Sequence, residues 1–200
     1  MESPIKGFIF DAGGVIIRYN NLDFYRRLSI RCNKSFDLVR SVIESKPLID
    51  FEKGIISYRE FKKIISDRLG IKAKDLRWVE DFSENSSLDL GTIDIIKRLK
   101  EKHYKIAVLS NIDRSRYKAL SKVIRDYRYL FNCIIPSFKI HHRKPEKEAF
   151  DYALNRMKLS YNNIIFIDDL KENVNGASKL GIRSILFKDY KSLIKELNKI

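Results

Sequence analysis

The sequence predicts an α/β fold in which a parallel sheet is covered by helices on both faces and a block of helices is inserted after the first strand. Short apolar runs rich in β-branched and aromatic residues alternate with helical patterns, as is typical of strands buried on both faces. The 200 residues, 44% of them hydrophobic and 33% charged, can form one sizeable core with an insertion. The predicted strands cover residues 7–10, 105–110, 132–137, 163–167 and 183–188.

The first strand ends in a carboxylate. Its apolar run GFIF (residues 7–10) stops at Asp11, and Ala12, Gly13 and Gly14 follow. Open α/β sheets bind ligands at the carboxyl ends of their strands, and glycines allow the backbone to approach a ligand closely. Asp11 is therefore a candidate functional residue, although an aspartate before glycines also begins many ordinary turns.

The block of helices follows this turn. Residues 15–21 have the pattern of a short hairpin that leaves the sheet, and helical patterns separated by short breaks follow up to residue 84. Ser57 and Glu60 have the spacing of a capping box, and an apolar stripe at helical spacing follows them. The predicted helices of the block cover residues 22–32, 35–45, 57–69 and 73–82.

Polar side chains also stand at the ends of two later strands. One strand ends in Ser110 and Asn111, and another is followed by Asp168 and Asp169. In a parallel sheet these positions share one edge with Asp11, so the sequence predicts a site there. Two adjacent carboxylates at a buried strand end repel each other unless a cation or a basic group neutralises them.

A lysine completes the set. Lys144 directly precedes Pro145, which can occupy the first turn of a helix predicted over residues 146–157. The sequence thus brings an aspartate, a hydroxyl, a lysine and an acidic pair to element ends, in that order. A further amphipathic helix is predicted over residues 92–102.

This ordered set resembles the four motifs of the haloacid dehalogenase (HAD) superfamily of phosphatases and phosphotransferases. Asp11 matches the nucleophile, Ser110 the hydroxyl of the second motif, Lys144 the lysine of the third, and Asp168 with Asp169 the acidic pair of the fourth. The resemblance covers nearly the whole chain. It is closest to the branch that contains sugar-phosphate phosphatases and the N-terminal phosphatase domain of epoxide hydrolases.

The resemblance implies a Rossmann-like core domain at residues 1–18 and 86–200, with a small α-helical cap domain at residues 19–85. The turn at residues 51–57 resembles the cap signature of the same branch. Four side chains of this region are candidates to contact the leaving group of a substrate: Tyr19, Glu52, Lys53 and Arg59.

The resemblance also implies an activity, a Mg²⁺-dependent phosphatase that acts on a small phosphomonoester through an aspartyl-phosphate intermediate. A sugar phosphate is one substrate that it suggests. The implied catalytic residues are Asp11, Ser110, Asn111 and Lys144, and the lysine would both neutralise phosphate oxygens and keep Asp11 ionised. The implied metal site consists of Asp11, the Gly13 carbonyl, Asp168 and Asp169, with Asp169 favoured as the direct ligand.

The chain departs from most phosphatases of this superfamily at Gly13, where they carry an aspartate as general acid and base. Such help is worth roughly 10²–10⁴ in rate. The branch that the chain resembles also has glycine here. If Gly13 has a positive φ, an aspartate in its place would be strained.

Two alternative functions fit part of the pattern. A 2-haloacid dehalogenase also combines an aspartate nucleophile with serine and asparagine in the second motif, but it is metal-free and does not explain Asp168 and Asp169. A catalytically weak HAD-like module could instead bind an acidic partner or nucleic acid, because the net charge is +14 and residues 97–128 hold 11 Lys and Arg against 3 Asp and Glu. A solvated lysine-rich face is the interpretation that we favour.

Other features limit location and partners. Cys32 and Cys133 lie far apart without metal-ligand spacing, which favours two reduced thiols. No apolar run approaches the ~18 residues of a membrane span, and the first residues lack the pattern of a signal peptide. We therefore expect a cytoplasmic protein with a small phosphorylated substrate, no membrane partner and no nucleic-acid partner. The oligomeric state is open, with a monomer favoured.

Overall fold

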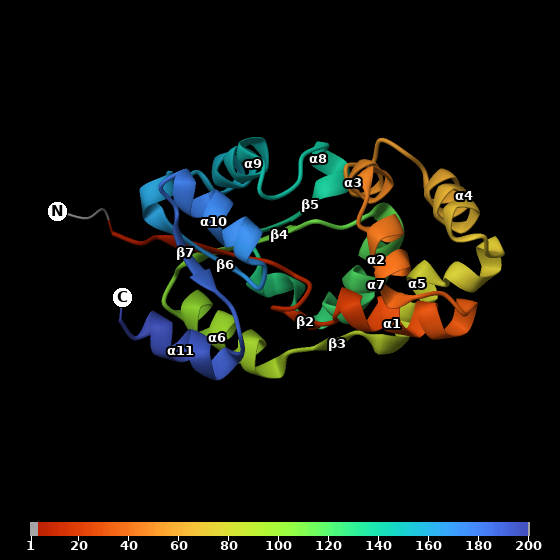
Figure 1. Cartoon of the computed structure of the whole chain (residues 1–200). Helices are drawn as coiled ribbons and strands as arrows, with labels where there is room; N and C mark the ends of the chain where they lie inside the picture. The colour runs from red at the N-terminus through yellow and green to blue at the C-terminus, as the bar shows by residue number, and fades with distance from the viewer. Residues whose placement is uncertain (1–3, 200) are drawn as a thin grey trace.

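A computed structural model describes residues 4–199 and has a five-stranded parallel sheet at its centre, in the order β5-β4-β1-β6-β7 (Figure 1). All five predicted strands are present within three residues of their expected ends, which confirms the α/β fold. The strands are β1 (Gly7–Phe10), β4 (Lys105–Ser110), β5 (Cys133–Pro136), β6 (Ile164–Asp168) and β7 (Arg183–Leu186).

Helices cover both faces of the sheet. Successive side chains of a strand point to opposite faces, and the apolar side chains on each face pack against helices. Phe8 and Phe10 of β1 pack on one face, with α6 (Leu90–Glu101) and α11 (Tyr190–Leu197). Ile9 packs on the other, with α9 (Lys147–Met157) and α10 (Lys171–Lys179). These two layers lie below and above the sheet in Figure 1. The continuous apolar runs of the strands follow from this double burial.

The helical insertion (residues 19–85) extends from one end of the sheet and has an apolar cluster of its own, in which Phe24 and Phe61 contact Trp78 at ring-centre distances of 5.2 and 5.0 Å (Figure 1). It lies between two short strands, β2 (Ile17–Arg18) and β3 (Ser87–Leu88), which pair antiparallel. Its helices are α1 (Asn21–Cys32), α2 (Phe36–Ile43), α3 (Lys46–Glu52), α4 (Tyr58–Leu69) and α5 (Trp78–Asn85), with a 3₁₀ turn η1 (Ala73–Leu76) before α5.

Several local predictions were wrong. The hairpin expected at residues 15–21 does not form, since β2 pairs with β3, which follows the insertion in the sequence. The helix expected at residues 73–82 is broken at Arg77, which has a left-handed φ of 41°. Helix α3, begun by a proline in its first turn, was not predicted. The capping box was correct, because Ser57 accepts from the Glu60 N–H at 3.2 Å and Glu60 accepts from the Ser57 N–H at 2.8 Å.

The remaining elements connect the core strands. Pro145 precedes α9 instead of occupying its first turn, because the helix begins at Lys147 with Glu146 as its N-cap. Cys32 and Cys133 are free thiols. Within residues 4–199, no helix is both long enough and apolar enough to cross a membrane. The other elements are α7 (Arg114–Val123), α8 (Ser137–Ile140) and the 3₁₀ turns η2 (Arg125–Leu130) and η3 (Tyr161–Asn163).

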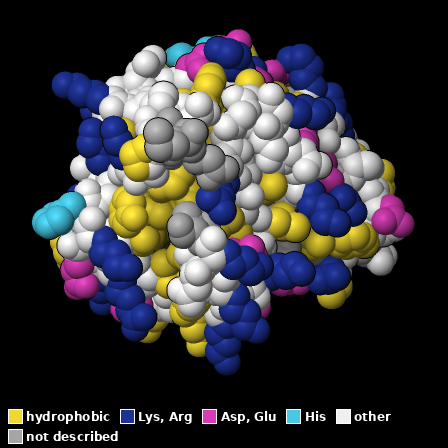
Figure 2. All heavy atoms as spheres, turned by 90° about the vertical axis from the view of Figure 1, so that its left-hand side faces the viewer, with side chains coloured by type: hydrophobic (Ala, Val, Ile, Leu, Met, Phe, Trp, Pro, Cys, Tyr) yellow, Lys and Arg dark blue, Asp and Glu magenta, His cyan; other side chains and the backbone are white. Residues whose placement is uncertain are grey.

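The basic residues are dispersed and several have partners. On the face that carries both chain ends, Lys and Arg side chains form separate groups and not one continuous patch (Figure 2). Within residues 97–128, Lys97 pairs with Asp94, and the buried Arg116 pairs with Asp113. On this face the positive charge is thus divided among separate groups of side chains.

Candidate active site

The predicted site residues meet at the carboxyl edge of the sheet. Asp11 follows β1, Ser110 ends β4, and Asp168 and Asp169 stand at the end of β6. A pocket of about 930 Å³ lies at this edge, beside the helical insertion. Its lining includes Asp11, Gly13, Ser110, Asn111, Lys144 and Asp169.

Lys144 is the centre of the site. Its side chain is 1% exposed, and Nζ lies 2.5 Å from Asp11 Oδ1 and 2.7 Å from Asp168 Oδ2. Burial of an ammonium group is costly unless it is paired and hydrogen-bonded, and here two carboxylates surround it. One lysine therefore joins the strand ends of β1 and β6.

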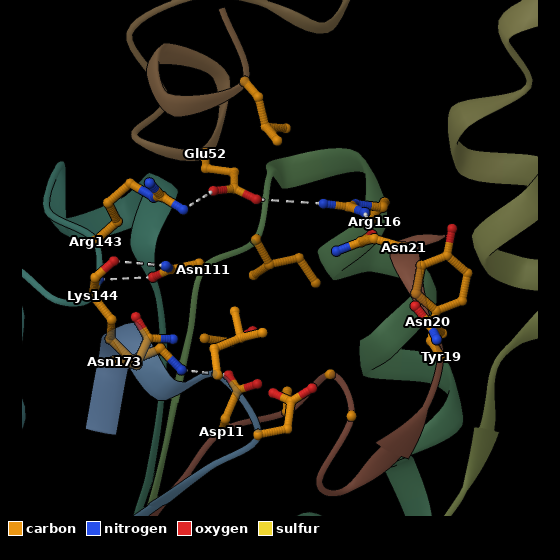
Figure 3. A pocket seen from close by; sticks show the side chains of 18 of the residues that line it. Asp11, Tyr19, Asn20, Asn21, Glu52, Asn111, Arg116, Arg143, Lys144 and Asn173 are labelled. Carbon is orange, nitrogen blue, oxygen red and sulfur yellow. Dashed lines mark hydrogen bonds and ion pairs between the residues drawn. The ribbon is translucent and has the colours of Figure 1, made fainter. Parts of the chain in front are cut away.

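Asn111 holds the backbone of this lysine. Its amide nitrogen donates to the Lys144 carbonyl at 2.9 Å, and its amide oxygen accepts from the Lys144 N–H at 2.8 Å (Figure 3). Both ends of the Asn111 side chain are thus occupied by the lysine's own peptide groups. Asn111 orients Lys144, and Ser110 beside it lines the pocket.

The two neighbouring aspartates differ in their surroundings. Asp168 is fully buried and accepts from Lys144, from the Leu170 N–H at 2.9 Å and from Asn173 Nδ2 at 3.0 and 3.1 Å. Asp169 is half-buried at the pocket, and no side chain within residues 4–199 donates a hydrogen bond to it. Asp169 therefore has carboxylate oxygens available to a ligand, whereas those of Asp168 are already used.

The acidic groups are close enough to share a cation. Oxygens of Asp11, Asp168 and Asp169 lie within 4.8 Å of one another. Burial, with the neighbouring carboxylates, raises the pKa of Asp11 to about 7 and that of Asp169 to about 6, although the Lys144 charge opposes both shifts. The Lys144 charge acts in the direction that we expected, toward the ionised form of Asp11, but burial outweighs it. A hard cation with oxygen ligands fits this set and would favour the ionised forms.

The two glycines of the turn differ in their backbone conformation. The positive φ, +78°, belongs to Gly14 and not to Gly13. A Cβ on Gly14 would lie 2.2 Å from Asp169 Oδ2, so this glycine allows the carboxylate to lie against the turn. A Cβ on Gly13 would meet nothing within 4 Å. Gly13 is therefore the one of the pair that can accept a side chain.

The sequence also matches a known protein family. A family model for haloacid dehalogenase-like hydrolases matches residues 5–181. The chain belongs to this family. The match to the HAD-like family includes the whole helical insertion and every predicted site residue.

Relatives of known activity cover the chain almost completely. A sesquiterpene phosphatase from Aspergillus oryzae is 23% identical over all of this chain and 98% of the relative. A D-ribitol-5-phosphate phosphatase from Bacteroides thetaiotaomicron is 24% identical over 90% of each chain. Other curated relatives are much longer, and the matches span 29% and 30% of two of them.

A solved structure shows the same fold. A HAD family enzyme from Bacteroides thetaiotaomicron, crystallised with magnesium and inorganic phosphate, is 23% identical, and the match covers 92% of this chain and 95% of that enzyme with a TM-score of 0.72. The similarity of fold extends over both the HAD-like sheet and the helical insertion.

The pocket also contains residues that the sequence did not predict. The structure further shows which of the four candidates near the insertion line it. Arg116, Arg143 and Asn173 were not singled out, although Arg143 directly precedes the lysine of the HAD motif. Of the four cap candidates, Tyr19 and Glu52 line the pocket, as do those three missed residues. Lys53 pairs with Glu146 at 2.7 Å, and Arg59 lies exposed on α4 outside the pocket.

Proposed function

We propose that the protein is a Mg²⁺-dependent phosphatase that hydrolyses a small phosphomonoester, with a sugar phosphate as the favoured class, through an aspartyl-phosphate on Asp11. The helical insertion acts as the cap over the site. The single observation that supports this most strongly is the Lys144 ion pair with Asp11 and Asp168, beside an Asp169 whose oxygens remain available.

Phosphoryl transfer mainly requires positioning and charge stabilisation. Asp11 attacks phosphorus, the bond from phosphorus to the leaving-group oxygen breaks, and water then hydrolyses the aspartyl-phosphate to release inorganic phosphate. One difficult displacement is thereby divided into two easier ones. Lys144 and the Ser110 hydroxyl stabilise phosphate oxygens, while Asn111 fixes the lysine. Asp11, Asp169 and the Gly13 carbonyl would hold Mg²⁺, with Asp168 behind them, and the bound ion would neutralise phosphate charge.

The acidic pair also argues against a 2-haloacid dehalogenase. Three carboxylates lie close together and two of them share one lysine, so the site has a surplus negative charge when all are ionised. A metal-free reaction would leave that charge unneutralised in a buried place, which is costly. A divalent cation removes the surplus, and it suits a phosphate substrate.

Metal removal tests the proposal. We expect chelation by EDTA to abolish hydrolysis of p-nitrophenyl phosphate and excess Mg²⁺ to restore it. Asp169→Asn should raise the Mg²⁺ concentration for half-maximal activity by at least ~10-fold, because a ligand oxygen is lost. Asp151→Asn, an aspartate on the exposed side of α9, is the matched control and should leave the Mg²⁺ titration unchanged. Full activity in the presence of chelator would contradict the metal assignment.

The absence of an acid at Gly13 leads to a second prediction. Without a proton donor there, kcat/KM should fall steeply as the leaving group becomes more basic, with acyl and aryl phosphates fast and alkyl phosphates slow. Gly13→Asp should flatten this dependence, since the turn has room for a Cβ. Gly13→Asn has a similar shape without the acidic proton and should retain the steep dependence. A flat dependence in the native protein would show that another group already supplies the proton.

A further inference from the structure

Two charged groups above Asp11 have unused hydrogen-bonding capacity. Glu52, the last residue of α3, is 5% exposed, and among the described residues neither its Oε2 nor Arg143 Nε has a hydrogen-bond partner, although both atoms are shielded from solvent. Arg143 Nη2 lies 3.1 Å from Glu52 Oε2, an ion pair that lacks hydrogen-bond geometry. Figure 3 shows this pair across the pocket from Asp11, with Arg116 on the other side of the carboxylate at 3.6 Å.

The Glu52 and Arg143 pair is held in place by hydrogen bonds between the insertion and the core. The Glu52 carbonyl accepts from Ser137 Oγ at 2.6 Å, and the next carbonyl, that of Lys53, lies 2.9 Å from His141 Nδ1. The turn after α3 is thereby fixed to the loop that leads to Arg143 and Lys144. Groups fixed before binding lose little freedom when a ligand arrives, which favours recognition.

Buried polar groups almost always have hydrogen-bond partners, so a donor on Arg143 and an acceptor on Glu52 that both lack one need a reason. A hydroxyl group supplies both missing bonds, because it can donate to the Glu52 carboxylate and accept from the Arg143 guanidinium. Both residues line the same pocket as Asp11 and Lys144. We infer that Glu52 and Arg143 are specificity-determining residues that bind a hydroxyl of the leaving group, an inference that rests on the proposed phosphatase function.

This inference separates two substrate classes suggested by the relatives. The cap side of the pocket also has apolar residues, among them Leu48 and Ile49, which could contact a hydrocarbon chain. Such a chain would leave Glu52 Oε2 and Arg143 Nε without partners. A site built to bond a substrate hydroxyl strongly rejects analogues that lack it. Polyol and sugar phosphates are therefore preferred to isoprenyl phosphates.

The test compares hydroxylated and plain substrates of equal length. A panel of polyol and sugar phosphates, including ribitol 5-phosphate, is measured against n-alkyl phosphates with the same number of carbons and against farnesyl phosphate. For the native protein, kcat/KM of the best hydroxylated substrate should exceed that of its alkyl counterpart by roughly 10²-fold. Glu52→Gln and Arg143→Lys should each reduce this ratio by at least ~10-fold, mainly through KM.

Acetyl phosphate separates recognition from folding. Its leaving group has no hydroxyl, so Glu52→Gln should lose at least ~10-fold more kcat/KM on the best hydroxylated substrate than on acetyl phosphate. Glu60→Gln, the same change at an exposed position of the insertion, should alter none of the rates. Equal use of alkyl or farnesyl phosphate by the native protein would overturn the inference, as would an equal loss on acetyl phosphate in Glu52→Gln. If p-nitrophenyl phosphate were not hydrolysed with Mg²⁺, the proposed function itself would fail.

Discussion

Asp11→Asn is expected to lower kcat for p-nitrophenyl phosphate by at least ~10⁴-fold, the scale seen when an enzyme loses its nucleophile. The amide cannot attack phosphorus at a useful rate, and it is a poorer metal ligand than a carboxylate. Asp11 lies at the end of β1 beside the buried Phe10, and asparagine has nearly the same shape. The fold should therefore remain, and steady-state kinetics with saturating Mg²⁺ measures the loss.

Asp94→Asn provides the control for this change. Asp94 is an exposed residue of α6 that pairs with Lys97 at 3.2 Å and does not line the pocket, so its substitution removes a similar charge outside the site. Its kcat should equal that of the native protein. If Asp11→Asn kept more than ~1% of the native kcat, with the same thermal stability, Asp11 could not be the nucleophile.

Lys144→Met should have the second largest effect, because it removes both a catalytic charge and the partner of two buried carboxylates. Loss of one partner of a buried ionic group typically costs about 3–5 kcal/mol of unfolding free energy. Removal of a preorganised charge that stabilises the transition state costs ~10²–10³ in kcat. Urea unfolding at neutral pH without metal measures the first effect, and hydrolysis of p-nitrophenyl phosphate measures the second.

Mg²⁺ should stabilise Lys144→Met more than it stabilises the native protein, because the variant leaves Asp11 and Asp168 without their shared cation. The matched control is Lys147→Met, which removes an exposed lysine that pairs with Asp151 one helical turn away. It should leave stability and kcat nearly unchanged. If Lys144→Met and the native protein had the same midpoint of urea unfolding, the buried ion pairs would contribute nothing net to stability.

The core of the fold could be predicted because its signals are local and strong. Each strand is an apolar run bounded by polar or turn residues. A continuous apolar run has to be buried on both faces, and a strand in a sheet covered by helices on both faces provides this burial. Helix α3 has only seven residues, so no periodic stripe distinguishes it. The break at Arg77 depends on a left-handed backbone that local sequence does not specify. The partner of β2 is set by the closure of the whole insertion.

Some residues of the site could likewise be predicted from the sequence, and others could not. Residues at strand ends, such as Asp11 and Asp169, could be anticipated because the topology of a parallel sheet brings strand ends together. The role of Asn111 depends on two hydrogen bonds to the Lys144 backbone, which only the folded loop reveals. The pairing of Glu52 with Arg143 joins two segments far apart in sequence. No spacing rule connects them, since their meeting depends on how the insertion docks on the core.

The most direct test of the central claim is detection of a phosphoryl group on Asp11. The native protein is mixed with Mg²⁺ and p-nitrophenyl phosphate, quenched in acid within milliseconds, digested and examined by mass spectrometry. We predict a phosphorylated peptide that contains Asp11, sensitive to hydroxylamine, and absent both in EDTA and in Asp11→Asn. Turnover of the substrate with no phosphorylation of this peptide at any quench time, or phosphorylation at another residue, would contradict the account.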